Sequence, residues 1–176
     1  MIQKIWTSEQ IDKRCVDIIL NDLTDKGIKR YLPVAIGSGG VELSYRLSDR
    51  YFNEVNRVRL NGLVPNIRVT FDVSRKNNKP SIEEKEGFDY GWIENQNVLL
   101  LLGIVHSGKT LRSAIAKIKK LKPRSITTVA TVWRSYNSNI KEPLHLFELD
   151  ADRFLFGFGM DYNGDFIKEP NIYYLD

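Results

Sequence analysis

The sequence predicts an α/β fold in which helices flank a twisted, mainly parallel sheet. An apolar run over residues 98–102 suits a strand that is buried on both faces, and a small polar turn connects it to an amphipathic helix. Segments typical of helices and strands alternate along most of the chain. Because 42% of the 176 residues are hydrophobic, the chain can bury one sizeable core, and we expect one domain over residues 1–176.

Helix and strand signals alternate in the first half of the chain. Thr7 and Gln10 have the spacing of a capping box at the start of the first helix, and Cys15 falls on the apolar face of that helix. β-branched residues and Phe71 favour a strand further along. The patterns predict, in order, a helix, a strand, a helix and a strand over residues 7–23, 32–36, 41–52 and 67–73.

A polar, charged segment over residues 74–96 separates these elements from the central strand. Pro80 and Gly87 interrupt it, and no periodic pattern runs through it. We expect a long irregular connection, which in a compact domain is either a functional lid or a surface segment without a function.

The turn after the central strand has the composition of an anion-binding site. It consists of His106, Ser107, Gly108, Lys109 and Thr110. Hydroxyl groups, a glycine and a cation here precede a helix, whose first amide groups point outward and whose dipole favours negative charge. The helix has one apolar face, carries lysines on the other and ends before Pro123.

Two other interpretations of this turn stay open. Gly103 and the Gly108-Lys109-Thr110 sequence also match the bare phosphate-loop pattern of nucleoside triphosphatases. Apolar Ile104 and Val105 inside that loop count against it, as does the absence of an acidic residue in the next apolar segment. The second alternative is an ordinary connection between a strand and a helix.

Taken together, these segments resemble the type I phosphoribosyltransferases, and among them the hypoxanthine-guanine and xanthine branch. LPVAIGSGG resembles the first strand and the diphosphate-binding loop, which would comprise Gly37, Ser38, Gly39 and Gly40. PRSITTVATVW resembles the strand that runs toward the base pocket, and FLFGFGMDYNGDFIKEPNIYYLD resembles the C-terminal segment. The resemblance implies the type I phosphoribosyltransferase fold with a small hood region, and it places a flexible cover of the active site at residues 74–96.

Several residues depart from the family's pattern. Leu102 and Gly103 stand where an acidic pair holds the ribose diol, and Ile167 stands where an arginine contacts diphosphate. His106 stands where an aspartate acts on the purine N7. Because a neutral imidazole can accept a proton near pH 7, His106 is the candidate catalytic residue as well as part of the 5′-phosphate site.

The resemblance also implies a base pocket and a metal ligand. The position of a base-contacting lysine falls on Ser135, with Arg134 one residue before it. Phe154 stands where an aromatic ring stacks on the base, and Leu155 could offer backbone contacts, although both could equally be core residues. Asp161 matches a carboxylate associated with Mg²⁺, but one aspartate does not establish a metal site.

We therefore expect a protein that binds a purine nucleotide or a phosphoribosyl compound through its 5′-phosphate. Ordinary transfer activity would be weak or lost, and the protein would have a regulatory or repurposed role, including a different reaction on a nucleoside 5′-monophosphate. The alternative is a divergent hypoxanthine, guanine or xanthine phosphoribosyltransferase of purine salvage.

Charge and targeting signals complete these expectations. The net charge of +4 mildly favours anionic ligands. The lysines of the helix after Thr110 could contact RNA, but a solvated helix face is favoured because no aromatic residues or arginine cluster accompany them. No secretory signal and no membrane-spanning stretch is visible, so we expect a cytoplasmic protein, and we expect it to be a homodimer.

Overall fold

Two sheets organise the protein, of which the computed structural model describes residues 1–23, 26, 31–54, 69–76, 79–135, 140–162 and 165–175. In chain order the elements are β1 (Ile2–Trp6), α1 (Ser8–Asp17), the π-helical turn η1 (Ile18–Leu23), β2 (Leu32–Ile36), α2 (Gly37–Glu54), β3 (Val69–Lys76), β4 (Lys79–Glu84), the 3-10 helix η3 (Tyr90–Ile93), β5 (Asn97–Val105), α3 (Lys109–Lys119), β6 (Ser125–Trp133), β7 (Leu144–Glu148), β8 (Phe154–Phe156) and β9 (Ile172–Leu175). None of the described helices is both long and apolar enough to cross a membrane.

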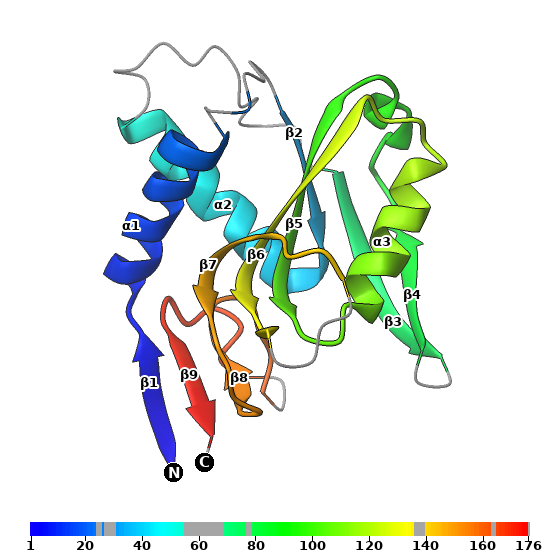
Figure 1. The fold of residues 1–176 in the computed structure, drawn as a ribbon. Coiled ribbons are helices and arrows are strands. Elements are labelled where there is room, and N and C mark those ends of the chain that lie inside the picture. Colours follow the sequence, from blue (N-terminus) through cyan, green and yellow to red (C-terminus); the bar gives the residue numbers. More distant parts are fainter. Residues whose placement is uncertain are drawn as a thin grey trace.

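A six-stranded sheet with the strand order β4-β3-β2-β5-β6-β7 forms the centre of the structure (Figure 1). Its neighbouring strands pair in parallel from β3 to β7, and β4 pairs antiparallel with β3. This arrangement confirms the predicted sheet. The carboxyl ends of β2, β5 and β6 therefore lie at one edge, which is where ligands bind in open α/β sheets.

The central strand β5 is buried on both faces, as its apolar run predicts. Leu99 and Leu101 pack into a cluster with residues of α1 and α2, whereas Leu100 and Leu102 pack into a cluster with residues of α3. These clusters show that α1 and α2 cover one face of the sheet and α3 covers the other. The alternation follows from the two-residue period of a strand.

A second, antiparallel sheet joins the two ends of the chain. Its strand order is β1-β9-β8, and both termini lie at its far end in Figure 1. The side-chain oxygen of Asn171 accepts a hydrogen bond from the Ser8 amide at 2.9 Å, which connects this sheet to the start of α1. Sequence patterns had not predicted β1, because a five-residue edge strand carries little periodic signal.

The predicted helices need two corrections. The Thr7–Gln10 capping box is confirmed in both of its hydrogen bonds, but regular α-helix ends at Asp17 and a π-helical turn occupies residues 18–23. α2 begins at Gly37 rather than at residue 41, so the glycine-rich segment over residues 37–40 is the first helical turn and not a loop.

The strands also differ from their predicted bounds. The strand expected over residues 67–73 is β3, which runs on to Lys76, while residues 67 and 68 lie outside the described part of the chain. β5 continues past residue 102 to Val105. Leu102, Gly103, Ile104 and Val105 therefore belong to a strand, which rules out the eight-residue phosphate loop of the nucleoside triphosphatases.

The expectation of an irregular connection over residues 74–96 is wrong. The end of β3, the strand β4 and the helix η3 occupy much of it. The Tyr90 hydroxyl donates a hydrogen bond to the Thr70 carbonyl at 2.9 Å and also contacts the backbone of Lys85, and the ring lies 4.7 Å from that of Phe71. Lys117 of α3 forms an ion pair with Glu84 at 2.6 Å. These long-range contacts order a segment whose local sequence has no periodicity.

The Tyr90 hydroxyl is therefore expected to stabilise the β3–β4 hairpin. Removing it in Tyr90→Phe should lower the free energy of unfolding by about 1 kcal/mol in thermal or urea melts at neutral pH. Burial raises the pKa of the Tyr90 phenol. Because the folded state favours the protonated form, this contribution should be present below about pH 10 and be lost as the pH rises further.

Tyr162→Phe is the control, since the described residues provide no hydrogen bond to its hydroxyl. An equal loss of stability in both variants would show that the bonds of Tyr90 do not hold the hairpin.

Candidate functional site

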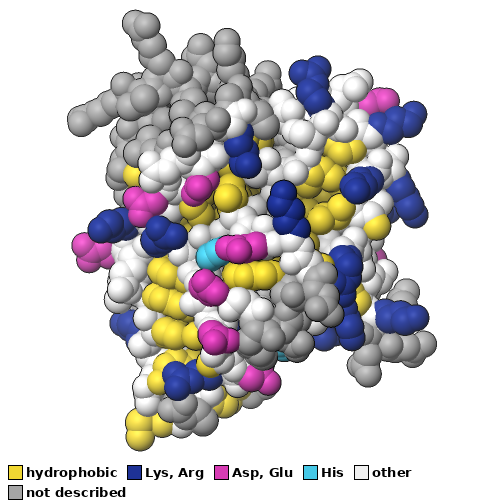
Figure 2. Space-filling view, viewed as in Figure 1, with side chains coloured by type: hydrophobic (Ala, Val, Ile, Leu, Met, Phe, Trp, Pro, Cys, Tyr) yellow, Lys and Arg dark blue, Asp and Glu magenta, His cyan; other side chains and the backbone are white. Residues whose placement is uncertain are grey.

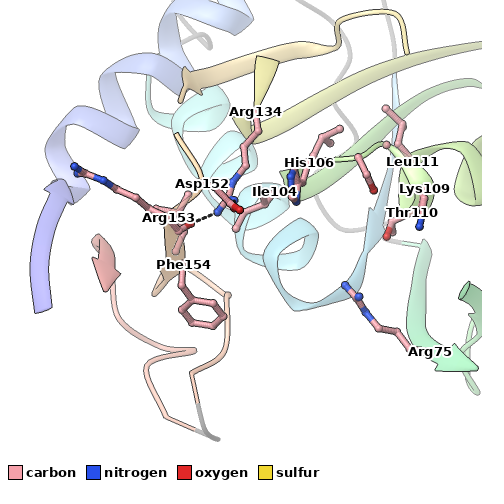
Figure 3. A pocket seen from close by; sticks show the side chains of 14 residues that line it. Arg75, Ile104, His106, Lys109, Thr110, Leu111, Arg134, Asp152, Arg153 and Phe154 are labelled. Carbon is pink, nitrogen blue, oxygen red and sulfur yellow. Dashed lines mark hydrogen bonds and ion pairs between the residues drawn. The ribbon is translucent and has the colours of Figure 1, made fainter. Parts of the chain in front are cut away.

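A cavity of about 570 Å³ lies at the carboxyl ends of β5 and β6. Its walls come from residues 104–111, from Arg134, from residues 152–155 and from Arg75. The cavity thus brings together the predicted phosphate turn and three of the four predicted base-pocket residues. Figure 3 shows Lys109 and Thr110 on one side, Asp152 and Phe154 on the other, and Arg75 reaching toward the space between them from β3.

The turn over residues 106–108 leaves the N-terminus of α3 open. Gly108 is the N-cap with a φ of 70°, and no side chain caps the helix. The first hydrogen bond of the helix runs from the Arg112 amide to the Gly108 carbonyl at 2.8 Å, so the preceding amides have no acceptor within the helix. Arg112 also donates to the Ser107 carbonyl at 3.2 Å, which holds the turn in place. This geometry suits a phosphate group.

Arg134 clamps the opposite wall of the cavity. Its side chain is 7% exposed and forms an ion pair at 3.0 Å with Asp152, and it also donates a hydrogen bond to the Arg153 carbonyl. The Arg134 amide donates to the Val105 carbonyl at 2.9 Å. Arg134 thereby connects the end of β5 to the turn before β8, and it fixes the backbone that leads into Phe154 and Leu155.

The remaining predicted base-pocket residues have different environments. Phe154 is 51% exposed and lines the cavity. Its ring belongs to an aromatic cluster, in which it lies 5.6 Å from the ring of Tyr162. Leu155 also lines the cavity but is only 3% exposed, so it offers little side-chain surface to a ligand. Ser135 is not among the residues that line the cavity.

The glycine-rich segment lies outside this cavity. Gly37 and Ser38 line a second cavity of about 360 Å³, together with Asp72, Lys85 and Lys168. Ser38 donates a hydrogen bond to the Gly159 carbonyl at 2.5 Å. Gly39 and Gly40 instead allow α2 to approach β5, because a Cβ at Gly39 would lie 2.8 Å from the Cα of Gly103. The first turn of α2 thus packs against β5, and only its start faces open space.

The two residues that replace the acidic pair are part of the packing. Leu102 is 2% exposed and belongs to the cluster under α3. A Cβ at Gly103 would lie 3.2 Å from the Cα of Gly39, so a carboxylate at this position would require the neighbouring backbone to move. Neither residue offers a side chain to a ribose.

The lysines of α3 lie on a mixed surface. In Figure 2, the part of the visible surface that α3 forms carries Lys and Arg side chains with hydrophobic side chains between them. Lys117 is committed to Glu84 by its ion pair. The lysine-rich face therefore serves in part to join α3 to β4.

Comparison with known proteins decides the family. The family model described as "Phosphoribosyl transferase domain" matches residues 5–163. The chain belongs to the phosphoribosyltransferase family. A hypoxanthine-guanine phosphoribosyltransferase from Bos taurus is 29% identical over 87 residues, covering 48% of this chain and 39% of the relative. Phosphoribosyltransferase domain-containing protein 1 from Xenopus tropicalis is 30% identical over 79 residues, covering 44% and 35%. The matched part spans less than two fifths of these curated relatives.

Solved phosphoribosyltransferases share the fold over nearly the whole chain. A hypoxanthine phosphoribosyltransferase from Staphylococcus aureus superposes with a TM-score of 0.78 at 22% identity, covering 99% of this chain and 91% of that one. The enzyme from Trypanosoma cruzi, in complex with the product IMP, gives a TM-score of 0.78 at 17% identity, with coverages of 98% and 90%. At these identities the likeness establishes the type I phosphoribosyltransferase fold.

The phosphoribosyltransferase fold raises the question of a metal ion. Asp161, the predicted ligand, is exposed and lines neither cavity. Among the described residues no group of three or more His, Cys, Asp or Glu side chains could hold a metal ion. Asp161 therefore does not belong to such a group among the described residues.

Three charged residues of the cavity were missed by the sequence interpretation. Arg75 comes from the hairpin that was expected to be irregular, while Asp152 and Arg153 form the turn before β8. The guanidinium of Arg153 lies 4.2 Å from the Tyr174 ring, so Arg153 lines the cavity mainly with its backbone. An isolated charge gives no signal in a single sequence, and the Arg134–Asp152 pair depends on a contact between residues 18 positions apart.

Loss of the Arg134 clamp should loosen the cavity wall. Arg134→Met keeps the apolar length but removes both hydrogen bonds, and it should lower the free energy of unfolding by about 1–3 kcal/mol in urea melts. Asp152→Asn keeps an acceptor oxygen and is the control, with an expected loss below about 1 kcal/mol. Equal stability of Arg134→Met and the unaltered protein would show that the clamp is not structural.

Proposed function

We propose that this phosphoribosyltransferase-fold protein binds a purine nucleotide or a related phosphoribosyl compound through its 5′-phosphate. One observation carries the proposal: the uncapped N-terminus of α3 and the half-exposed ring of Phe154 face the same cavity, which has a volume of about 570 Å³. An anion site and an aromatic surface in one cavity match the two ends of a nucleotide.

The phosphate would bind at the turn over residues 106–110. The Ser107 and Thr110 hydroxyls and the first amides of α3 are hydrogen-bond donors at this turn, and Lys109 adds a positive charge. Gly108 lets the backbone approach the ligand closely because its positive φ is unfavourable for other residues. His106, at the start of the turn, could donate to the phosphate or contact the base.

Ordinary phosphoribosyl transfer by this site would be weak. The reaction needs groups that hold the ribose, stabilise the departing diphosphate and take a proton from the base. Leu102 is buried in an apolar cluster and Gly103 contacts Gly39, so β5 contributes no carboxylate to a ribose. We therefore favour a regulatory role or a different reaction on a nucleoside 5′-monophosphate.

A divergent hypoxanthine, guanine or xanthine phosphoribosyltransferase is the second candidate. The observation that favours it is the place of His106, which lines the same cavity as Phe154 and Leu155. From there an imidazole could accept the proton that the base loses during transfer. The solved relatives with the same fold include the Trypanosoma cruzi enzyme in complex with IMP.

The phosphate-binding proposal is tested at Gly108. In Gly108→Val the β-branched side chain would strain the positive φ and displace Ile140, whose Cδ1 lies 2.6 Å from the position of a Cβ. Affinity for IMP or GMP should fall at least about tenfold by calorimetry. Gly87→Val is the matched control, because Gly87 also has a positive φ of 87° but nothing lies within 4 Å of its Cβ position. Unchanged affinity in Gly108→Val would move the phosphate site elsewhere.

The two candidate functions differ in turnover. With Mg²⁺, phosphoribosyl diphosphate and hypoxanthine, guanine, xanthine or adenine, we expect turnover far below the roughly 1–1,000 per second of ordinary enzymes. Each missing interaction can cost a factor of about a hundred. Any activity that survives should disappear in His106→Ala and persist in His145→Ala, since His145 lies on β7 with its Nδ1 3.1 Å from the Pro143 carbonyl. Turnover in the ordinary range would establish the second candidate.

A further inference from the structure

A third cavity, of about 440 Å³, lies between α3, the start of β6 and the segment that leads into β7. An ion pair between Lys117 and Glu84 joins α3 to β4, and Figure 1 shows α3 on the β4 side of the large sheet. The start of β6 is less well covered than its end, since residues 125–128 are only partly buried and residues 129–133 are buried. The third cavity is the space that α3 leaves over this strand.

Apolar side chains form the inner surface of the third cavity, and cations surround them. Ile115, Ile126 and Ile140 line it and pack against the cluster under α3. Figure 2 shows such apolar side chains between Lys and Arg side chains on the part of the surface that α3 forms. The charged residues of the lining are all exposed and comprise four cations and one carboxylate, namely Lys26, Arg112, Lys119, Lys141 and Glu142.

Most of these cations are available to a ligand. Within the described part of the chain, none of the three lysines has a carboxylate partner. The carboxylate of Glu142 instead lies 3.5 Å from the Nδ1 of His145. An apolar surface surrounded by available cations is complementary to a small amphipathic anion, whose body is buried by the hydrophobic effect and whose charge pairs with a lysine. The volume falls within the range of about 300–1,000 Å³ that is typical of small-molecule sites.

The third cavity also touches the back of the turn between β5 and α3. The Cδ1 of Ile140 lies 2.6 Å from the position of a Cβ at Gly108, so Ile140 packs directly against this glycine. Arg112 donates one hydrogen bond to the Ser107 carbonyl and another to the Gly108 carbonyl. Leu111 lines both the third cavity and the cavity of about 570 Å³. A ligand in the third cavity would therefore contact side chains that support the turn.

We propose that the third cavity is an effector site, which binds a small aromatic or short aliphatic carboxylate and thereby strengthens nucleotide binding in the cavity of about 570 Å³. The bound carboxylate packs against Ile140 and Leu111 and restricts the turn, so that less ordering remains when the nucleotide binds. By linkage, the nucleotide strengthens carboxylate binding by the same factor. The effect on nucleotide affinity rests on the proposed function, whereas the carboxylate site itself does not.

Binding of 2-naphthoate tests the site, with 2-naphthamide as a neutral probe of the same shape. By calorimetry 2-naphthoate should bind once per chain and at least about tenfold more tightly than 2-naphthamide. Lys119→Glu should weaken 2-naphthoate binding at least about tenfold. Lys120→Glu is the matched control and should leave the affinity unchanged, because Lys120 is the exposed neighbour at the end of α3 and does not line the cavity. Equal affinity for the two probes, or an equal loss in the two variants, would overturn the site.

Titration of IMP with and without saturating 2-naphthoate tests the effector role. The affinity for IMP should rise about fivefold or more with 2-naphthoate. Ile140→Ala removes the contact with Gly108, so it should abolish this rise while 2-naphthoate still binds. Unchanged or weaker IMP binding would overturn the effector role, and competition between the two ligands would place 2-naphthoate in the larger cavity and overturn the site. Failure of IMP to bind in either condition would overturn the proposed function and the coupling, while the 2-naphthoate titrations would still decide the site.

Discussion

Burial of β5 on both faces is the constraint on which the rest of the structure depends. Residues 98–101 have no exposed surface, and their side chains alternate between the cluster of α1 and α2 and the cluster of α3. The alternation continues through positions 102 and 103 and is interrupted at Ile104, which packs against the cluster of α1 and α2, while Val105 belongs to the cluster of α3. Leu102 therefore points into the α3 cluster and position 103 faces α2, so the edge where ligands bind receives polar groups only after Val105.

Close packing between α2 and β5 explains the glycines at the start of the helix and near the end of the strand. Glycines at positions 39, 40 and 103 let the start of α2 and the end of β5 meet backbone to backbone. A glycine-rich segment after a strand is compatible with two structures, an anion-binding loop or a helix that begins at the strand end, and the sequence pattern is the same in both. Here the helix starts at Gly37, and α3 begins after the end of β5 at an N-terminus that no side chain caps.

The parts of the fold that could be predicted from sequence are those with a strong period or a local cap. The buried run of β5, the amphipathic face of α3 and the Thr7–Gln10 capping box are examples, and resemblance to a family supplied the type of fold. The hairpin of β3 and β4 could not be predicted, because contacts from Tyr90 and Lys117 hold it and neither leaves a pattern in the neighbouring residues. In the candidate site, the composition of residues 106–110 indicated the turn, whereas Arg75 and Asp152 depend on tertiary structure alone.

The cationic side chains that line the cavity have different roles. Arg134 is nearly buried, and its terminal nitrogens are committed to Asp152 and the Arg153 carbonyl, while its Nε is buried without a partner among the described residues. An unsatisfied buried donor costs about 1–3 kcal/mol, so the ion pair and the backbone contact must offset that cost. A guanidinium held in this way cannot turn toward a ligand without losing both bonds. In the proposed function, the charge that attracts a ligand would therefore come from Arg75 and Lys109, which line the cavity, and Arg134 would hold the wall that includes Phe154 and Leu155.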